Sequence, residues 1–169
     1  MGFLKGKTAI ITGGGRSVLK DGSCGSIGYG IATAYAKEGA NLVITGRNKQ
    51  KLADAKEELE RLYNIEVLPV QADVSAGADN ETVVQNVIDE TIAKFGRIDV
   101  LINNAQASAS GVAANEWGPD GINANIICPL AWTAQLENFQ QAYPEAFEAN
   151  VKMPPAGHYG DVEKEIGRV

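Results

Sequence analysis

Short runs of apolar and β-branched residues alternate along this chain with longer segments in which apolar residues recur every three or four positions. The short runs are typical of strands buried on both faces of a sheet, and the longer segments are typical of amphipathic helices. Four runs have strand character: Thr8–Ile11, Asn41–Thr45, Glu66–Val70 and Ile98–Ile102. Because strands and helices alternate, the pattern predicts an α/β fold with a doubly wound parallel sheet.

Three segments between these strands have helical periodicity. The first begins at Ser26 and stops at Gly39, the second covers residues 49–63, and the third runs from an N-cap at Asp79 to a stop at Gly96. The apolar positions expected to face the sheet are Ile27, Ile31, Ala34 and Tyr35, then Leu52, Ala55, Leu59 and Leu62, then Val84, Val87, Ile88 and Ile92.

The last third of the chain continues the alternation. Residues Ile122–Cys128 predict a further strand that Pro129 ends, and residues 134–150 form either an amphipathic surface helix or a cover over a ligand. We therefore expect a single domain over residues 1–169, with three Rossmann-like layers and an incomplete sheet of about five strands.

Composition narrows the function classes. Hydrophobic residues make up 44% of the 169 positions and 19 residues are glycine, which excludes a disordered or fibrous chain. A net charge of −6 without a basic stripe argues against a nucleic-acid partner. No run is long enough for a signal peptide or a membrane span, and the distant Cys24 and Cys128 have no metal-like spacing. We expect a cytoplasmic protein with reduced thiols, no metal and no membrane contact.

A glycine-rich loop, residues 13–28, joins the first strand to the first helix. Glycines let a backbone approach a pyrophosphate closely, and the following helix presents free N–H groups to the negative charge. In a doubly wound sheet, ligands bind beyond the carboxyl ends of the strands. The pairs Gly46-Arg47, Asp73-Val74 and Asn104-Ala105 follow the other three strands, so we expect all four segments to converge on one crevice.

Two arginines indicate which dinucleotide this crevice would take. Arg47 follows the second strand where an acidic residue would hold a ribose hydroxyl, and Arg16 lies in the glycine loop. Guanidinium groups suit a 2′-phosphate, so NADP(H) is favoured over NAD(H). Alternatively, Arg47 caps a turn and Arg16 is solvated. Asp73 either accepts from an adenine amino group or caps a turn, and Asn104 either lines the pocket or stabilises the fourth strand.

These motifs together resemble the short-chain dehydrogenase/reductase family: Thr12-Gly13 through Ser26-Ile27-Gly28, Asp73-Val74, Asn103-Asn104-Ala105, and Asn125 with Pro129. The run from Ser26 to Ala32 also resembles the divergent enoyl-carrier-protein reductases of that family. The resemblance implies a dinucleotide-binding domain that transfers hydride between NADP(H) and a small carbonyl or alcohol substrate. The cofactor-binding residues it implies, together with the two arginines, are Gly13, Arg16, Ser26, Ile27, Arg47, Asp73, Val74, Asn104, Ala105, Pro129 and Thr133.

The chain departs from the family in its catalytic half. Gln106 and Leu130 stand where glycines are usual, and none of the five tyrosines is followed four places later by the lysine that the family's proton transfer needs. Only a short loop, in which Ser108 and Ser110 are expected to be turn residues, separates the Asn-Asn-Ala motif from residues 114–122. Residues 114–122 resemble a segment that lies much further along the chain in other members of this family. We therefore expect an internal deletion near residues 111–114, a truncated C-terminus and no catalytic residues.

Three hypotheses follow. The chain represents part of a complete NADP(H)-dependent oxidoreductase, or it is a shortened protein that binds a nucleotide without reducing a carbonyl, or it is a nucleotide-binding or interaction module derived from that family. The helices through which the family assembles fall in the deletion, so an oligomer is not supported by this chain. A chain this short should leave apolar sheet surface uncovered beside the fourth strand, with poor solubility or compensating association. His158, the only histidine, is expected at the surface.

Overall fold

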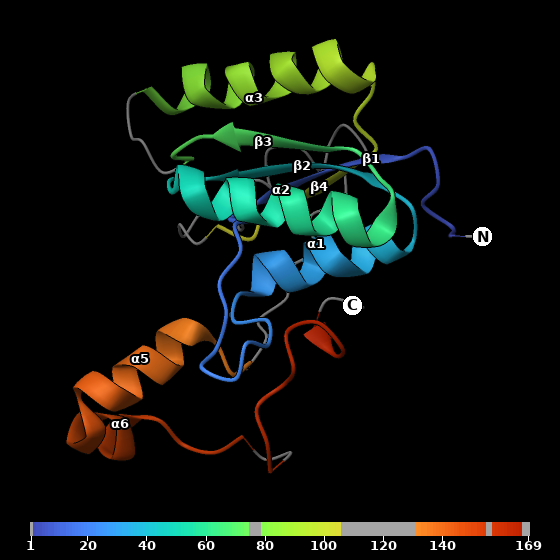
Figure 1. Ribbon diagram of the computed structural model, residues 1–169. Coiled ribbons are helices and arrows are strands. Elements are labelled where there is room, and N and C mark those ends of the chain that lie inside the picture. The colour runs from blue at the N-terminus through green and yellow to red at the C-terminus, as the bar shows by residue number, and fades with distance from the viewer. Residues whose placement is uncertain (1, 75–78, 106–130, 155–156, 167–169) are drawn as a thin grey trace, which may run out of the picture.

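Four short apolar runs form one parallel sheet in the computed structural model, which describes residues 2–74, 79–105, 131–154 and 157–166 (Figure 1). The strands are β1 (Thr8–Thr12), β2 (Asn41–Gly46), β3 (Val67–Gln71) and β4 (Val100–Ile102). Their order in the sheet is β3-β2-β1-β4, with Ile10 level with both Val43 and Leu101. This is the predicted α/β, Rossmann-like arrangement, and all four strands expected over residues 8–102 are present.

Helices cover both faces of the sheet and give three layers (Figure 1). The helices α1 (Ile27–Lys37) and α2 (Lys49–Tyr63) pack on one face, and α3 (Asn80–Phe95) packs on the other. Further along the chain, α5 (Ala134–Ala142) and α6 (Pro144–Asn150) pack against each other beyond the glycine loop. The bounds of the first three helices agree with the predicted ones to within about two residues. As predicted, Gly96 ends α3, and it adopts a left-handed φ of 72°.

The sheet separates two apolar clusters because neighbouring strand residues point to opposite faces. Alternate residues of β1 and β2, such as Ile11 and Ile44, pack with α1 and α2, and both are completely buried. Ile10 and Val43 point the other way and pack with Val87 of α3. The larger cluster lies on the α1–α2 face, so that face holds most of the core.

All three predicted helix faces are wrong in part. On α1, the residues buried in the core are Tyr29, Ala32 and Ala36, whereas the predicted Ile27, Ile31, Ala34 and Tyr35 are only partly buried, because the face that meets the sheet is rotated from the predicted one. Leu62 was expected in the core, but it is 49% exposed because the buried stripe of α2 stops one turn earlier, at Leu59. On α3, the residues that meet the sheet are Val83, Val87, Thr91 and Phe95, whereas Val84 and Ile92 are 40% and 46% exposed. The helix is rotated relative to the predicted stripe, because its apolar positions span more than one face and only one face meets β2 and β3.

The C-terminal part of the chain packs on α1 in a way that the periodicity did not predict. Residues 162–165 form turns and Ile166 lies in a 3-10 turn. Val162 is 2% exposed, and a Cβ on Gly30 would lie 2.1 Å from the Val162 carbonyl oxygen. Glycine is therefore needed at this crossing. The predicted strand Ile122–Cys128, the proposed deletion near 111–114, and Ser108 and Ser110 lie outside the described residues.

Candidate functional site

The glycine loop after β1 is held at the carboxyl edge of the sheet by backbone contacts. Gly13 adopts a left-handed φ of 70°, which suits glycine, and a Cβ there would lie 2.9 Å from the Asn104 side-chain nitrogen. The N–H of Gly14 donates to the Thr45 carbonyl at 3.1 Å, which ties the loop to the end of β2. A side chain on Gly14 would press into Ile44, at 2.8 Å. The start of the loop is thus a backbone surface without side chains of its own.

Gly28 allows α1 to reach this loop. A Cβ on Gly28 would lie 2.3 Å from the Gly13 carbonyl oxygen and 2.5 Å from the Asn104 side-chain nitrogen. The first turn of α1 therefore packs directly on the backbone of the loop. Ser26 occupies the N-cap position, and its hydroxyl donates to the Gly15 carbonyl at 3.0 Å rather than capping the helix. Ile27 is the first helical residue and is half-buried.

Asn104 stabilises the ends of two strands. Its side-chain nitrogen donates to the Thr12 carbonyl at 2.9 Å, and its own N–H and that of Ala105 both donate to the Thr12 hydroxyl at 2.9 Å. Of the two roles that the sequence left open, the described contacts of Asn104 match the stabilisation of the fourth strand. They also place Asn104 and Ala105 beside Gly13 and Gly28, so two of the four segments expected to converge, the glycine loop and Asn104-Ala105, lie together.

The two arginines predicted for the phosphate lie in different surroundings. Arg16 forms an ion pair with Glu58 of α2, and the buried Tyr29 lies near both side chains. Burial, followed by the nearby Glu58 carboxylate, raises the pKa of Tyr29 well above its usual range. Arg47 is exposed at the end of β2, where its carbonyl accepts from Gln71 at 3.0 Å. The structure thus directs Arg16 to the α1–α2 interface and leaves Arg47 at the sheet edge.

Residues 16–25 form a small hairpin within the glycine loop. Val18 and Cys24 pair in antiparallel fashion, and the turn passes through Gly22 at a φ of 84°. Burial raises the pKa of the Cys24 thiol to about 11, so it is neutral at physiological pH. The hairpin also contacts α5: the N–H of Ala134 donates to the Gly25 carbonyl at 2.8 Å, and that of Lys20 donates to Glu137 at 3.2 Å.

The remaining predicted cofactor residues are less closely grouped. Asp73 is exposed and Val74 half-buried just after β3, and Val74 packs against the smaller apolar cluster. Thr133 is the N-cap of α5, and its hydroxyl accepts from the Leu136 N–H at 3.2 Å. Pro129 lies outside the described residues. The contacts of Val74 could not be read from the sequence, since they depend on neighbouring elements.

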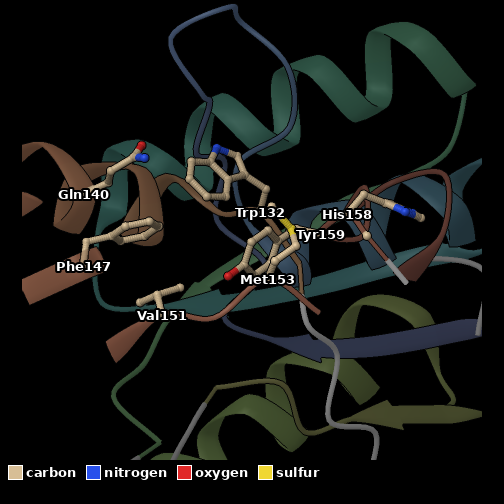
Figure 2. A pocket seen from close by; sticks show the side chains of 8 residues that line it. Trp132, Gln140, Phe147, Val151, Met153, His158 and Tyr159 are labelled. Carbon is tan, nitrogen blue, oxygen red and sulfur yellow. The ribbon is translucent and has the colours of Figure 1, made fainter. Parts of the chain in front are cut away.

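A hollow of about 460 Å³ lies between α5, α6 and the segment that follows them (Figure 2). Figure 2 shows Trp132 and Phe147 among the side chains that line it, together with Met153 and Tyr159. The Trp132 ring lies 6.1 Å from Phe147 and 5.5 Å from Tyr159, between ring centroids. The volume of the hollow is within the range of about 300–1,000 Å³ typical of small-molecule sites. Segment 134–150 thus helps to line an aromatic hollow, and His158 is at its rim, largely exposed as expected.

Lys51 and Ser17, whose side chains lie together at the glycine loop, are not among the site residues predicted from the sequence. The Lys51 ammonium donates to the Ser17 hydroxyl at 2.9 Å, and the N–H of Arg16 donates to the Lys51 carbonyl at 2.9 Å. The sequence signal that could have identified Lys51 is its position in the first turn of α2, four residues after Arg47. In the described part of the chain, no cluster of His, Cys, Asp and Glu could hold a metal ion. Among the described helices, none is long and apolar enough to cross a bilayer.

A family model and a similar curated protein both relate this chain to the same family of proteins. Residues 7–113 match the family model described as "short chain dehydrogenase". The 12alpha-hydroxysteroid dehydrogenase of a Clostridium species is 45% identical over 239 aligned positions, which take in 100% of this chain and 90% of that relative. Because this chain has 169 residues, at least 70 of those 239 positions have no residue in it.

Solved structures of L-sorbose reductase from Gluconobacter frateurii, complexed with NADPH and L-sorbose, are also similar. One is 33% identical with a TM-score of 0.52, and the match covers 63% of this chain but only 35% of that chain. A second structure of the same reductase matches over 98% of this chain and 88% of the reductase chain, with a TM-score of 0.71. Because the two sequences are only 19% identical, this match supports the fold alone.

Proposed function

The chain belongs to the short-chain dehydrogenase/reductase family of oxidoreductases, and on that premise we propose that it binds NADP(H) at the loop between β1 and α1. The supporting observation is the contact between Gly28 and the Gly13 carbonyl, where a Cβ would come within 2.3 Å. Gly13, Ser26 and Ile27 would lie along the pyrophosphate, with Asn104 and Ala105 bordering the nicotinamide side. When bound, the cofactor supplies or accepts the hydride, and the chain supplies its binding and orientation.

The preference for NADP(H) over NAD(H) rests on the end of β2. Arg47 stands there in place of the acidic residue that would bind a ribose 2′-hydroxyl. Its side chain is exposed, and it takes part in none of the ion pairs found among the described residues. A guanidinium group placed in this way suits a phosphate dianion. Asp73 and Val74 would lie beside the adenine, and Pro129 and Thr133 near the nicotinamide.

The 169-residue chain would bind the cofactor without turning over a substrate. None of its five tyrosines is followed four places later by a lysine, so the usual proton donor of this family has no counterpart. Tyr29 is no substitute, because it is 5% exposed and its pKa is raised by burial between α1 and α2. The 239 aligned positions against 169 residues support an internal deletion as the cause, in a single domain whose catalytic segment is missing.

A hydroxysteroid or the corresponding ketone is the proposed substrate class of the undeleted protein. The alignment that spans 90% of a relative, gaps in this chain included, is with a 12alpha-hydroxysteroid dehydrogenase. The hollow lined by Trp132, Phe147 and Tyr159 supports this class, because flat aromatic side chains bury a rigid apolar ring system well.

Fluorescence titration of the chain with NADPH and NADH tests the cofactor proposal. We expect NADPH to bind at least about tenfold more tightly, a difference of about 1.4 kcal/mol. The variant Arg47→Asp should lose this preference, whereas Arg61→Asp, near the far end of α2, should keep it. Equal affinities for the two dinucleotides would contradict the NADP(H) preference, and no binding of either would contradict the function.

Turnover is tested separately, with NADPH and a 12-oxosteroid and by mass spectrometry of the product. No product should form, although equilibrium dialysis should detect the steroid bound to the chain. Product formation by a chain whose mass corresponds to 169 residues would refute the loss of catalysis. Absence of steroid binding would refute the substrate class.

A further inference from the structure

Arg16 forms an ion pair within the protein, with Glu58. Its guanidinium is paired with Glu58 and borders Tyr29, between α1 and α2, and only 31% of its side chain is exposed. A phosphate that recruited Arg16 would have to break this pair and leave the Glu58 carboxylate next to the Tyr29 ring. Arg16 is therefore poorly suited to bind the 2′-phosphate, although it lies in the glycine loop.

Lys51 offers a second cation beside the same loop. Its ammonium lies 2.9 Å from the Ser17 hydroxyl, and its carbonyl accepts from the Arg16 N–H at 2.9 Å. A Cβ on Gly15 would lie 3.2 Å from the Lys51 Cβ, so the loop and the first turn of α2 are in contact. The N–H of Lys51 donates to the Asn48 side chain at 3.0 Å, which places it one turn from the end of β2. Its position is thus set by three separate hydrogen bonds.

The charge of Lys51 is not compensated by a carboxylate in the part of the chain that the structure describes. The nearby Asp54 accepts from Gln50 at 2.8 Å, and Lys51 belongs to none of the ion pairs among the described residues. A neutral hydroxyl partner leaves the ammonium able to bind an anion, and the Ser17 hydroxyl can itself donate to one. Arg47 lies four residues before Lys51, just after β2, and the Thr45 carbonyl near the end of β2 accepts from the Gly14 N–H, so both cations follow a strand end that contacts the glycine loop.

We propose that Lys51 and Ser17, acting with Arg47, select the 2′-phosphate of NADP(H), and that Arg16 has no part in this selection. The inference rests on the proposed function, since it takes a dinucleotide at the glycine loop as given. An ammonium group is a compact charge with three donors, and together with a hydroxyl and a guanidinium it can surround a phosphate dianion. NADH lacks this phosphate, so its affinity should depend little on Lys51.

Binding titrations of the 169-residue chain with NADPH and with NADH test this assignment. We expect Lys51→Met to weaken NADPH binding about tenfold, the usual value of a hydrogen bond to a charged group, and to change NADH binding less than about twofold. Ser17→Ala should act in the same direction with a smaller effect, and Lys51→Arg should restore most of the NADPH affinity. Arg16→Met should leave the ratio of the two affinities unchanged.

Arg61→Met is the matched control, because it removes one positive charge from the same helix about 15 Å further along its axis. Circular dichroism melting of each variant verifies folding. An equal loss of NADPH and NADH affinity in Lys51→Met, or a loss of the preference in Arg16→Met, would overturn the assignment alone. If the unmodified chain binds neither dinucleotide, the proposed function fails and the assignment fails with it.

Discussion

At the residue scale, Thr12 shows how one hydroxyl group organises the carboxyl edge of the sheet. Its oxygen accepts from the N–H groups of Asn104 and Ala105, both at 2.9 Å, and its proton goes to the Ile102 carbonyl at 3.3 Å. A hydroxyl has one donor and two acceptor positions, so the group is fully used. It joins the end of β1 to the turn after β4, where Gly13 lies beside Asn104 and Ala105.

Replacing Thr12 by Val tests this role, since it keeps the shape but leaves two N–H groups without their acceptor. We expect a loss of about 2 kcal/mol in the free energy of unfolding, measured by urea denaturation. Thr12→Ser keeps the hydroxyl and should lose much less. Equal stability of the Val and Ser variants would show that the hydroxyl does not hold this edge.

At the element scale, Asp99 joins β1 and β4 at the opposite edge. Its carboxylate accepts from Arg97, from the Thr8 N–H at 2.9 Å and from the Lys7 ammonium at 3.2 Å. The hydrogen bonds from Arg97 and then from the Thr8 N–H hold the pKa of this carboxyl well below its usual range. The two strands are thus joined by a side chain at each end of their pairing.

The variant Asp99→Asn tests this link through its pH dependence. A carboxyl whose pKa is lower in the folded chain stabilises the fold above its unfolded pKa of about 4, and this stabilisation is lost as the pH falls toward the folded-state pKa. Wild type should therefore be more stable than Asp99→Asn at pH 7, and the difference should shrink below about pH 4. Urea denaturation at about pH 7, 4 and 3 measures it. A difference that stays constant over this range would contradict the link, and Asp54→Asn, at a half-buried position on α2, serves as control.

At the scale of the whole molecule, the sheet is covered unevenly. Leu101 of β4 is level with Ile10, so it points to the face that α3 covers, yet it is 48% exposed. Ile98, just before β4, is 38% exposed. The apolar surface expected beside the fourth strand is therefore present, and β4 is the outer strand of the described sheet. An apolar outer strand favours association between copies of a chain.

We expect the chain to associate as its concentration rises, and Leu101→Lys to reduce this association. Sedimentation velocity over a range of concentrations measures both. Leu62→Lys is the matched control, since Leu62 is 49% exposed but lies on α2 rather than on the sheet. A monomer at all concentrations, or an equal effect of the two substitutions, would contradict the prediction.

The sequence by itself determined the order of strands and helices, the glycine loop and the absence of a tyrosine–lysine pair, because these depend on local periodicity, glycine and residue spacing. The tertiary structure decided which side of α3 is buried, that Leu62 is exposed, and that Arg16 pairs with Glu58 while Lys51 meets Ser17. These outcomes depend on how elements distant in sequence pack together, and periodicity within one element carries no information about that. The family follows from motifs read along the chain, whereas the side chains available to a cofactor follow from the fold.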